Sequence, residues 1–106
     1  MANNRLFLAF REPGPSWVPG VPPRQQPLWD EHAAFMDDLF ARGHVVLAGP
    51  YADFSRALVI MDAGDAAEAS ALLGGDPWEK AGILVPGQII EWILYLDSRK
   101  LQTVPR

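Results

Sequence analysis

The sequence predicts a single α+β domain whose elements follow the order β-α-β-β-α-β. Short apolar runs mark four strands, two stretches with helical spacing separate them, and glycine or proline stands at most boundaries. This order is the split β-α-β pattern of a ferredoxin-like fold, in which two helices cover one face of a four-stranded antiparallel sheet. A chain of 106 residues suits one such domain over residues 1–106, without repeats.

The first predicted strand is the apolar run RLFLAF, residues 5–10. A proline-rich segment follows over residues 11–27 and contains six of the ten prolines. Because proline fixes φ and has no backbone N–H, this segment can form neither a helix nor a central strand. We therefore predict a long, stiff loop with Trp17 near its middle.

The first predicted helix spans residues 27–43. Pro27 suits the first position of a helix, and Gly43 suits the left-handed residue that ends one. The apolar positions recur at steps of three and four and form one stripe, which consists of Leu28, His32, Phe35, Met36, Leu39 and Phe40.

The second half of the chain repeats the alternation of strand and helix. Strands are predicted at residues 44–53 and 55–62, and the short gap between them indicates an antiparallel hairpin. A second helix is predicted over residues 64–75, where Asp65 and Glu68 have the spacing of a capping box.

The last predicted strand spans residues 87–97. The segment 98–106 is short and polar, so we expect it to fray. The folded core should therefore span residues 5–97.

Both faces of the predicted sheet are apolar. An antiparallel sheet with one wet face should alternate apolar and polar residues. The third strand instead sets Leu58 and Ile60 against Ala57, Val59 and Met61. Two helices cover only one face, so we expect a second copy of the chain to cover the other in a two-fold homodimer. The alternative is that the proline-rich loop folds over the open face.

Charge and composition narrow the classes of partner. The formal net charge is −4 and there is no basic stripe, which argues against nucleic acid and anionic membranes as partners. No stretch approaches the ~18 apolar residues of a membrane span, and the N-terminal apolar run is too short for a signal peptide. The chain has no cysteine and no cluster of metal ligands. We expect a cytoplasmic protein without a metal.

His32 and Asp76 are the candidates for chemistry. His32 lies on the apolar stripe, where a histidine is often a satisfied core group, but it can also move a proton near neutral pH. Asp76 fits the N-cap of a short helical turn, with Pro77 at the first position and Glu79 at the third, and such a cap contributes ~1 kcal/mol. A capping carboxylate could also fix the tautomer of a histidine.

Three of the four tryptophans flank these residues in the sequence. Trp29 precedes His32 by less than a turn, Trp78 follows Asp76, and Trp17 lies on the proline-rich loop. Tryptophans are commonly core residues, but several at one opening would form a flat apolar site for a ring-shaped ligand.

The stretch HAAFMDDLFARGHVVLAGPYAD resembles a signature of the YCII-related (YciI-like) family. That signature has a histidine on the first helix, a glycine at its end and a strand closing in Ala-Gly-Pro, here His32, Gly43, Ala48, Gly49 and Pro50. A second signature places Asp-Pro, an aromatic residue and a glycine after the second helix, here Asp76, Pro77, Trp78 and Gly82. The resemblance covers about residues 5–97.

The resemblance implies a ferredoxin-like dimeric α+β barrel with a cleft that contains a His–Asp pair, carried here onto His32 and Asp76. A related activity is loss of chloride from a chlorinated hydroxyquinone, and the wider superfamily includes muconolactone isomerases and small monooxygenases. The long proline-rich loop and the extra tryptophans depart from the short family pattern, so the resemblance names no substrate.

The sequence thus predicts an acid–base enzyme that needs no cofactor and acts on a small cyclic or aromatic substrate. His32 would be the general base and acid, with Asp76 orienting it. The substrate-binding residues would be Trp17, Trp29, Trp78 and Pro50. Two alternatives stay open: a binding protein that holds a small ligand without turnover, and a structural dimer whose His32 and Asp76 are only core and cap.

Overall fold

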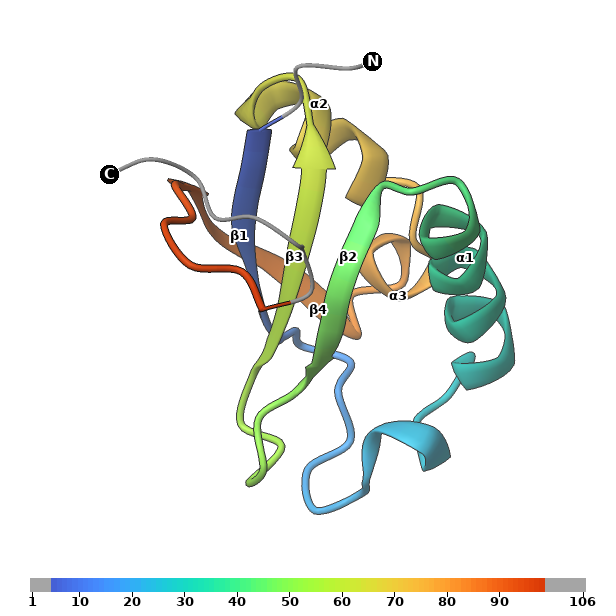
Figure 1. Ribbon diagram of the computed structural model, residues 1–106. Coiled ribbons are helices and arrows are strands. Elements are labelled where there is room, and N and C mark those ends of the chain that lie inside the picture. The colour runs from blue at the N-terminus through green and yellow to red at the C-terminus, as the bar shows by residue number, and fades with distance from the viewer. Residues whose placement is uncertain (1–4, 99–106) are drawn as a thin grey trace.

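The computed structural model describes residues 5–98, which form a four-stranded antiparallel sheet and three α-helices. The strand order is β2-β3-β1-β4, and the helices lie behind the sheet in Figure 1, on one of its faces. The elements are β1 (Arg5–Pro13), α1 (Trp29–Ala41), β2 (Val45–Pro50), β3 (Ala57–Ala63), α2 (Ala66–Leu73), α3 (Pro77–Lys80) and β4 (Leu84–Trp92). The predicted ferredoxin-like α+β fold is confirmed, with the one-turn α3 as a third helix.

The strand β1 is longer than predicted. It runs past Phe10 to Pro13, so residues 11–13 belong to a central strand and not to the proline-rich loop. Pairing with β3 ends at Arg11, while pairing with β4 continues to Pro13. Proline is tolerated there because β1 has become an edge on the β3 side. The rest of the loop contains one 3-10 turn, Pro23–Gln25.

The helix α1 begins at Trp29, so the prediction that Pro27 is its first residue is wrong. Leu28 is the N-cap and has a left-handed backbone with a φ of 61°, which costs a non-glycine residue about 1–2 kcal/mol. The predicted C-terminal end is confirmed, since Gly43 has a φ of 84°.

The strand β4 is displaced from the predicted range 87–97. It begins at Leu84 because the extended β1 supplies Pro13 as a partner. It ends at Trp92, which pairs with Leu6, so residues 93–97 lie beyond this pairing. Apart from Ser98, the predicted tail 98–106 lies outside the described residues.

The main core lies between the sheet and the helices. Alternate residues of the strands, such as Phe7, Ala9 and Met61, point to this side of the sheet and pack against Leu39 and Leu73. All five are almost fully buried. The predicted hairpin forms, but its strands span Val45–Pro50 and Ala57–Ala63 and not 44–53 and 55–62. The cap of α2 forms as predicted, with Asp65 accepting a hydrogen bond from the Glu68 N–H at 2.8 Å.

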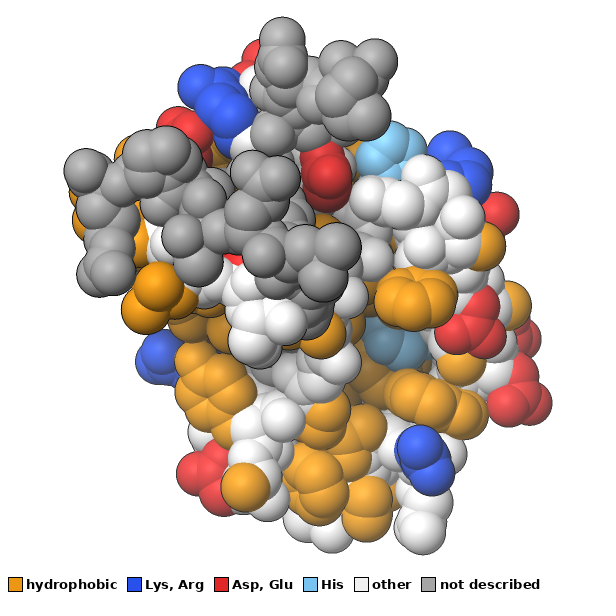
Figure 2. Space-filling model, viewed as in Figure 1, with side chains coloured by type: hydrophobic (Ala, Val, Ile, Leu, Met, Phe, Trp, Pro, Cys, Tyr) orange, Lys and Arg blue, Asp and Glu red, His pale blue; other side chains and the backbone are white. Residues whose placement is uncertain are grey.

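The opposite face of the sheet is apolar and partly exposed, as the sequence pattern predicts. Leu47, Ile90 and Trp92 are each more than 40% exposed on it, and Figure 2 shows hydrophobic side chains gathered over its lower part. The proline-rich loop does not cover this face, because Trp17 packs on the helix side against Trp78. No helix of residues 5–98 is long and apolar enough to cross a membrane.

Candidate functional site

The side chains of His32 and Asp76 meet behind the sheet, although 44 positions separate them in the sequence. The Nδ1 atom of His32 lies 2.9 Å from Oδ1 and 2.8 Å from Oδ2 of Asp76. Asp76 is 1% exposed, and the His32 side chain is 13% exposed. The pair is therefore held inside the domain with only the imidazole in reach of solvent.

Local structure around α3 fixes the position of Asp76. Asp76 is the N-cap of α3, and its Oδ1 accepts a hydrogen bond from the Trp78 N–H at 2.9 Å. Pro77 occupies the first helical position, as predicted. The predicted capping box is incomplete, because Glu79 turns away from the cap and pairs with Arg11. Asp76 is thus both a cap and a partner of His32.

The contact with Asp76 determines the tautomer of neutral His32. An ionised carboxylate only accepts hydrogen bonds, so Nδ1 carries the proton and donates it. The other ring nitrogen, Nε2, then has a free lone pair. Nε2 has no hydrogen-bond partner among residues 5–98. It is also not fully enclosed by these residues. Nε2 is therefore available to a ligand.

Two tryptophans contact the imidazole. The ring of Trp78 is stacked on His32, with centroids 3.8 Å apart and planes 8° from parallel. Trp29 lies against the same ring at 5.6 Å, and Trp17 meets Trp78 edge-on at 5.8 Å. The indole N–H of Trp78 donates to the Pro27 carbonyl at 2.7 Å, which fixes the plane of the stack.

Polar contacts fix the proline-rich loop that carries Trp17. The loop begins with a hydrogen bond from the Gly14 N–H to the Ile83 carbonyl at 2.9 Å. Farther along, the buried amide of Gln26 accepts from the Val18 N–H and donates to the carbonyls of Val18 and Val21, all within 2.9 Å. The position of Trp17 is thus set by the loop and not only by its own packing.

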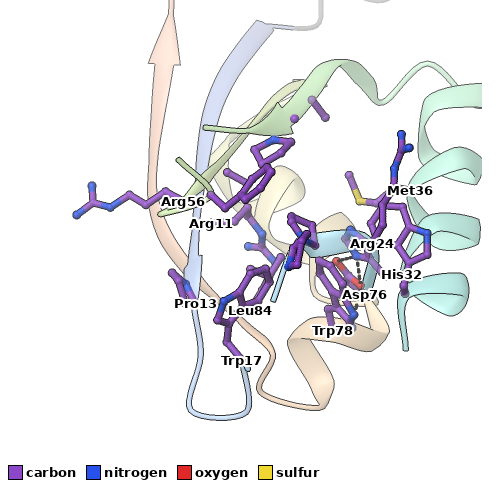
Figure 3. Close-up of a pocket in the computed structure, with 18 of the residues that line it drawn as sticks. Arg11, Pro13, Trp17, Arg24, His32, Met36, Arg56, Asp76, Trp78 and Leu84 are labelled. Carbon is purple, nitrogen blue, oxygen red and sulfur yellow. Dashed lines mark hydrogen bonds and ion pairs between the residues drawn. The ribbon is translucent and has the colours of Figure 1, made fainter. Parts of the chain in front are cut away.

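A cavity of about 650 Å³ opens between the sheet, α1 and the proline-rich loop. All six residues that the sequence predicts for a site line it: His32, Asp76, Trp17, Trp29, Trp78 and Pro50. Figure 3 shows several of them converging from different elements. The volume is in the range of small-molecule sites, and the walls are mainly apolar.

Sequence reasoning missed Arg11, which lines the cavity from β1. The predicted proline-rich loop begins at residue 11, and the side chain of a loop residue cannot be placed on either face of the sheet from the sequence. The alternation of Phe7, Ala9 and Arg11 was the available signal, because it places a charge on the buried face of a strand. Phe54 and Met36 also line the cavity and were not predicted for the site.

Among the described residues, no group of three or more His, Cys, Asp or Glu side chains is placed to hold a metal ion. The expectation of a site without a metal stays a prediction.

The comparison with family models shows to which protein family the chain belongs. The model described as a YCII-related domain matches residues 6–93, which include all of the described helices and strands except the first residue of β1, and both members of the His32–Asp76 pair. Comparison with curated proteins and with solved structures yields no match. Because the matched region is most of the sequence, the chain belongs to the YCII-related family.

Proposed function

We propose that the protein is an enzyme that performs general acid–base chemistry on a small cyclic or aromatic substrate. His32 would be the general base and acid, and Asp76 would orient it. The observation that carries the proposal is the geometry of His32. Its Nδ1 is bound by both carboxylate oxygens of a buried aspartate, and its Nε2 is unpaired in the described structure. This is the arrangement of a histidine oriented as a general base.

The proposed reaction begins with proton transfer from a substrate C–H group to Nε2 of His32. The electrons of that bond form a new double bond in the substrate. In a lyase or dehydrochlorinase reaction the bond between carbon and the leaving group breaks, and the leaving group, such as chloride, departs with that electron pair. The imidazolium then releases its proton to solvent. In an isomerase, the imidazolium returns the proton to another carbon. Asp76 stays ionised and stabilises the imidazolium between the two steps.

The shape of the cavity supports a ring-shaped substrate. Trp17, Trp29 and Trp78 supply flat apolar surfaces beside the imidazole, and Pro50 contributes to the wall from β2. Aromatic surfaces of this kind favour planar ligands through stacking and through burial of apolar area. No cofactor enters the proposed steps, because the imidazole can carry the proton by itself.

Solvent exchange tests the proposal directly. A library of hydroxyquinones, chlorinated hydroxyaromatics and lactones is incubated with the protein in D₂O, and proton NMR follows both product formation and loss of C–H signals. We expect exchange or conversion of at least one compound, and a loss of ~10²–10⁴-fold in His32→Gln. Exchange that persists in His32→Gln would contradict the role of His32.

The alternative is a binding protein in which the pair only hydrogen-bonds a ligand. The mainly apolar cavity is equally suited to that role. It predicts saturable ligand binding without any conversion or deuterium exchange in the native protein.

We also propose a homodimer that forms through the open sheet face, and a cytoplasmic location without nucleic-acid or membrane partners. The exposed apolar residues of that face support the dimer. The net charge of −4 and the absence of cysteine support the rest.

A further inference from the structure

Arg11 is a buried cation in the cavity wall. Arg11 is 2% exposed and lies on the same face of β1 as the core residues Phe7 and Ala9. Removing a guanidinium from water costs several kcal/mol unless its N–H groups are paired. An arginine in this place therefore needs partners.

The described structure pairs only part of the guanidinium. Nη2 of Arg11 donates to Oε1 of Glu79, and the side chain makes no other hydrogen bond within residues 5–98. Within residues 5–98, Oδ1 of Asp62 is the one fully enclosed polar side-chain atom that has no hydrogen-bond partner. Nε and Nη1 of Arg11 thus have no hydrogen-bond partner in this range and are not fully enclosed, and the residue lines the cavity.

Most of the charged residues that line the cavity are arginines. Arg11, Arg24 and Arg56 line it, whereas its acidic residue, Asp76, is occupied by His32. This balance contrasts with the net charge of −4 of the whole chain. Figure 3 shows the nitrogen end of Arg11 directed toward the middle of the site and Arg56 extending away from it. Arg11 is therefore the cation placed to meet a ligand inside.

We propose that the substrate is a ring-bearing carboxylic acid whose carboxylate binds Arg11. This inference rests on the proposed function and narrows its substrate class. A guanidinium offers a planar fork of donors that matches a carboxylate in two parallel hydrogen bonds. Arg11 lines the cavity from β1 and His32 lines it from α1, together with Trp17, Trp29 and Trp78. We therefore expect a ring whose carboxylate binds Arg11 to lie within reach of Nε2.

Matched pairs of acids and amides test the proposal by binding alone. The probes are benzoate with benzamide and 1-naphthoate with 1-naphthamide, measured by tryptophan fluorescence and by calorimetry. Each pair has the same ring and nearly the same shape, so the difference isolates the carboxylate. We expect the acid of at least one pair to bind ~10-fold or more tightly than its amide, since a hydrogen bond between charged groups is stronger than one to a neutral amide.

Variants assign the preference to Arg11. The double variant Arg11→Gln/Glu79→Gln removes both charges together, so neither is left buried without its partner. Circular dichroism checks its fold. We expect the acid preference to fall to within ~3-fold of unity there. It should persist in the control Arg42→Gln, which changes an exposed arginine that does not line the cavity.

Three results would overturn the proposal: equal affinities in both pairs, a preference that survives in the double variant, or no binding of either acid at millimolar concentration. His32→Gln separates this inference from the proposed function. It should keep the acid preference while losing turnover. A native protein that prefers acids but never exchanges a substrate proton would overturn the enzyme and leave the carboxylate site standing.

Discussion

The imidazole of His32 and the indole of Trp78 lie parallel at a centroid distance of 3.8 Å. This contact fixes the imidazole plane, while the bond to Asp76 fixes its rotation. Trp78 also connects the pair to the second small core, which contains Ile83 and Leu84. One residue therefore couples the orientation of the histidine to the stability of this end of the domain.

Replacing Trp78 tests this coupling. Trp78→Ala should destabilise the protein by about 3–5 kcal/mol, because it removes a buried aromatic ring and leaves a cavity. Trp78→Phe keeps a stacking surface but loses the bond to the Pro27 carbonyl, so we expect a smaller loss of about 1–2 kcal/mol. Urea unfolding measures both values. Equal stabilities of the two variants and the native protein would contradict the structural role of the ring.

Asp76→Asn tests the orientation of His32. The amide cannot accept with two equivalent oxygens, so the Nδ1–H tautomer loses its main support. We expect turnover to fall by about 10²–10⁴-fold, as for the loss of a carboxylate that orients a catalytic histidine. Nitrogen-15 NMR of the imidazole reports the tautomer independently of activity. An unchanged Nδ1–H signal in Asp76→Asn would show that other contacts hold the ring.

Gln26 and Gly14 provide tests of the proline-rich loop. Gln26→Ala breaks three hydrogen bonds and should cost about 2 kcal/mol while loosening Trp17. Gly14→Ala should be at least as damaging, because a Cβ atom there would lie 2.1 Å from the Gly82 carbonyl oxygen. Fluorescence quenching reports the exposure of Trp17. The exposed Gln25→Ala serves as the matched control and should behave like the native protein.

The β2–β3 turn should respond to acid. Hydrogen bonds from the Ser55 hydroxyl and then from the Ser55 N–H lower the pKa of the exposed Asp53 below its usual value. Since the folded pKa is lowered, the turn is favoured above pH ~4 and loses this support as the pH falls through the lowered value. The Ser55 amide signal should therefore shift at low pH in the native protein. A similar shift in Asp53→Ala would assign the effect to another group.

The spacing of apolar residues and the residues typical of helix ends predicted the order of the helices and strands, but they did not predict the lengths of the strands. The left-handed Gly43 is a local feature, so the sequence reports it directly. The predicted stripe on α1 is correct only in part, because Leu39 is buried whereas Leu28 and Phe40 are exposed. The ends of β1 and β4 depend on each other instead. Pro13 lies in a strand because Leu84 is its partner, and no local pattern contains that pairing.

The site shows the same division between local and distant information. The cap at Asp76 could be read from Asp-Pro-Trp-Glu, but its contact with His32 depends on how α1 and α3 pack. Only the family resemblance joined the two residues in advance. Arg11 was missed because the register of β1 beyond Phe10 decides which way its side chain points.

The last prediction concerns the open sheet face, where Leu47, Ile90 and Trp92 are exposed. A second copy that covered these residues would bury a continuous apolar surface, which is the usual basis of a homodimer. We expect the native protein to be dimeric in analytical ultracentrifugation. Ile90→Glu should make it monomeric, because the new charge would be buried in the interface. Phe40→Glu is the matched control, since Phe40 is an equally apolar, exposed residue on α1, on the other side of the sheet. A native monomer, or dimers of equal strength in Ile90→Glu, would show that this face serves another purpose.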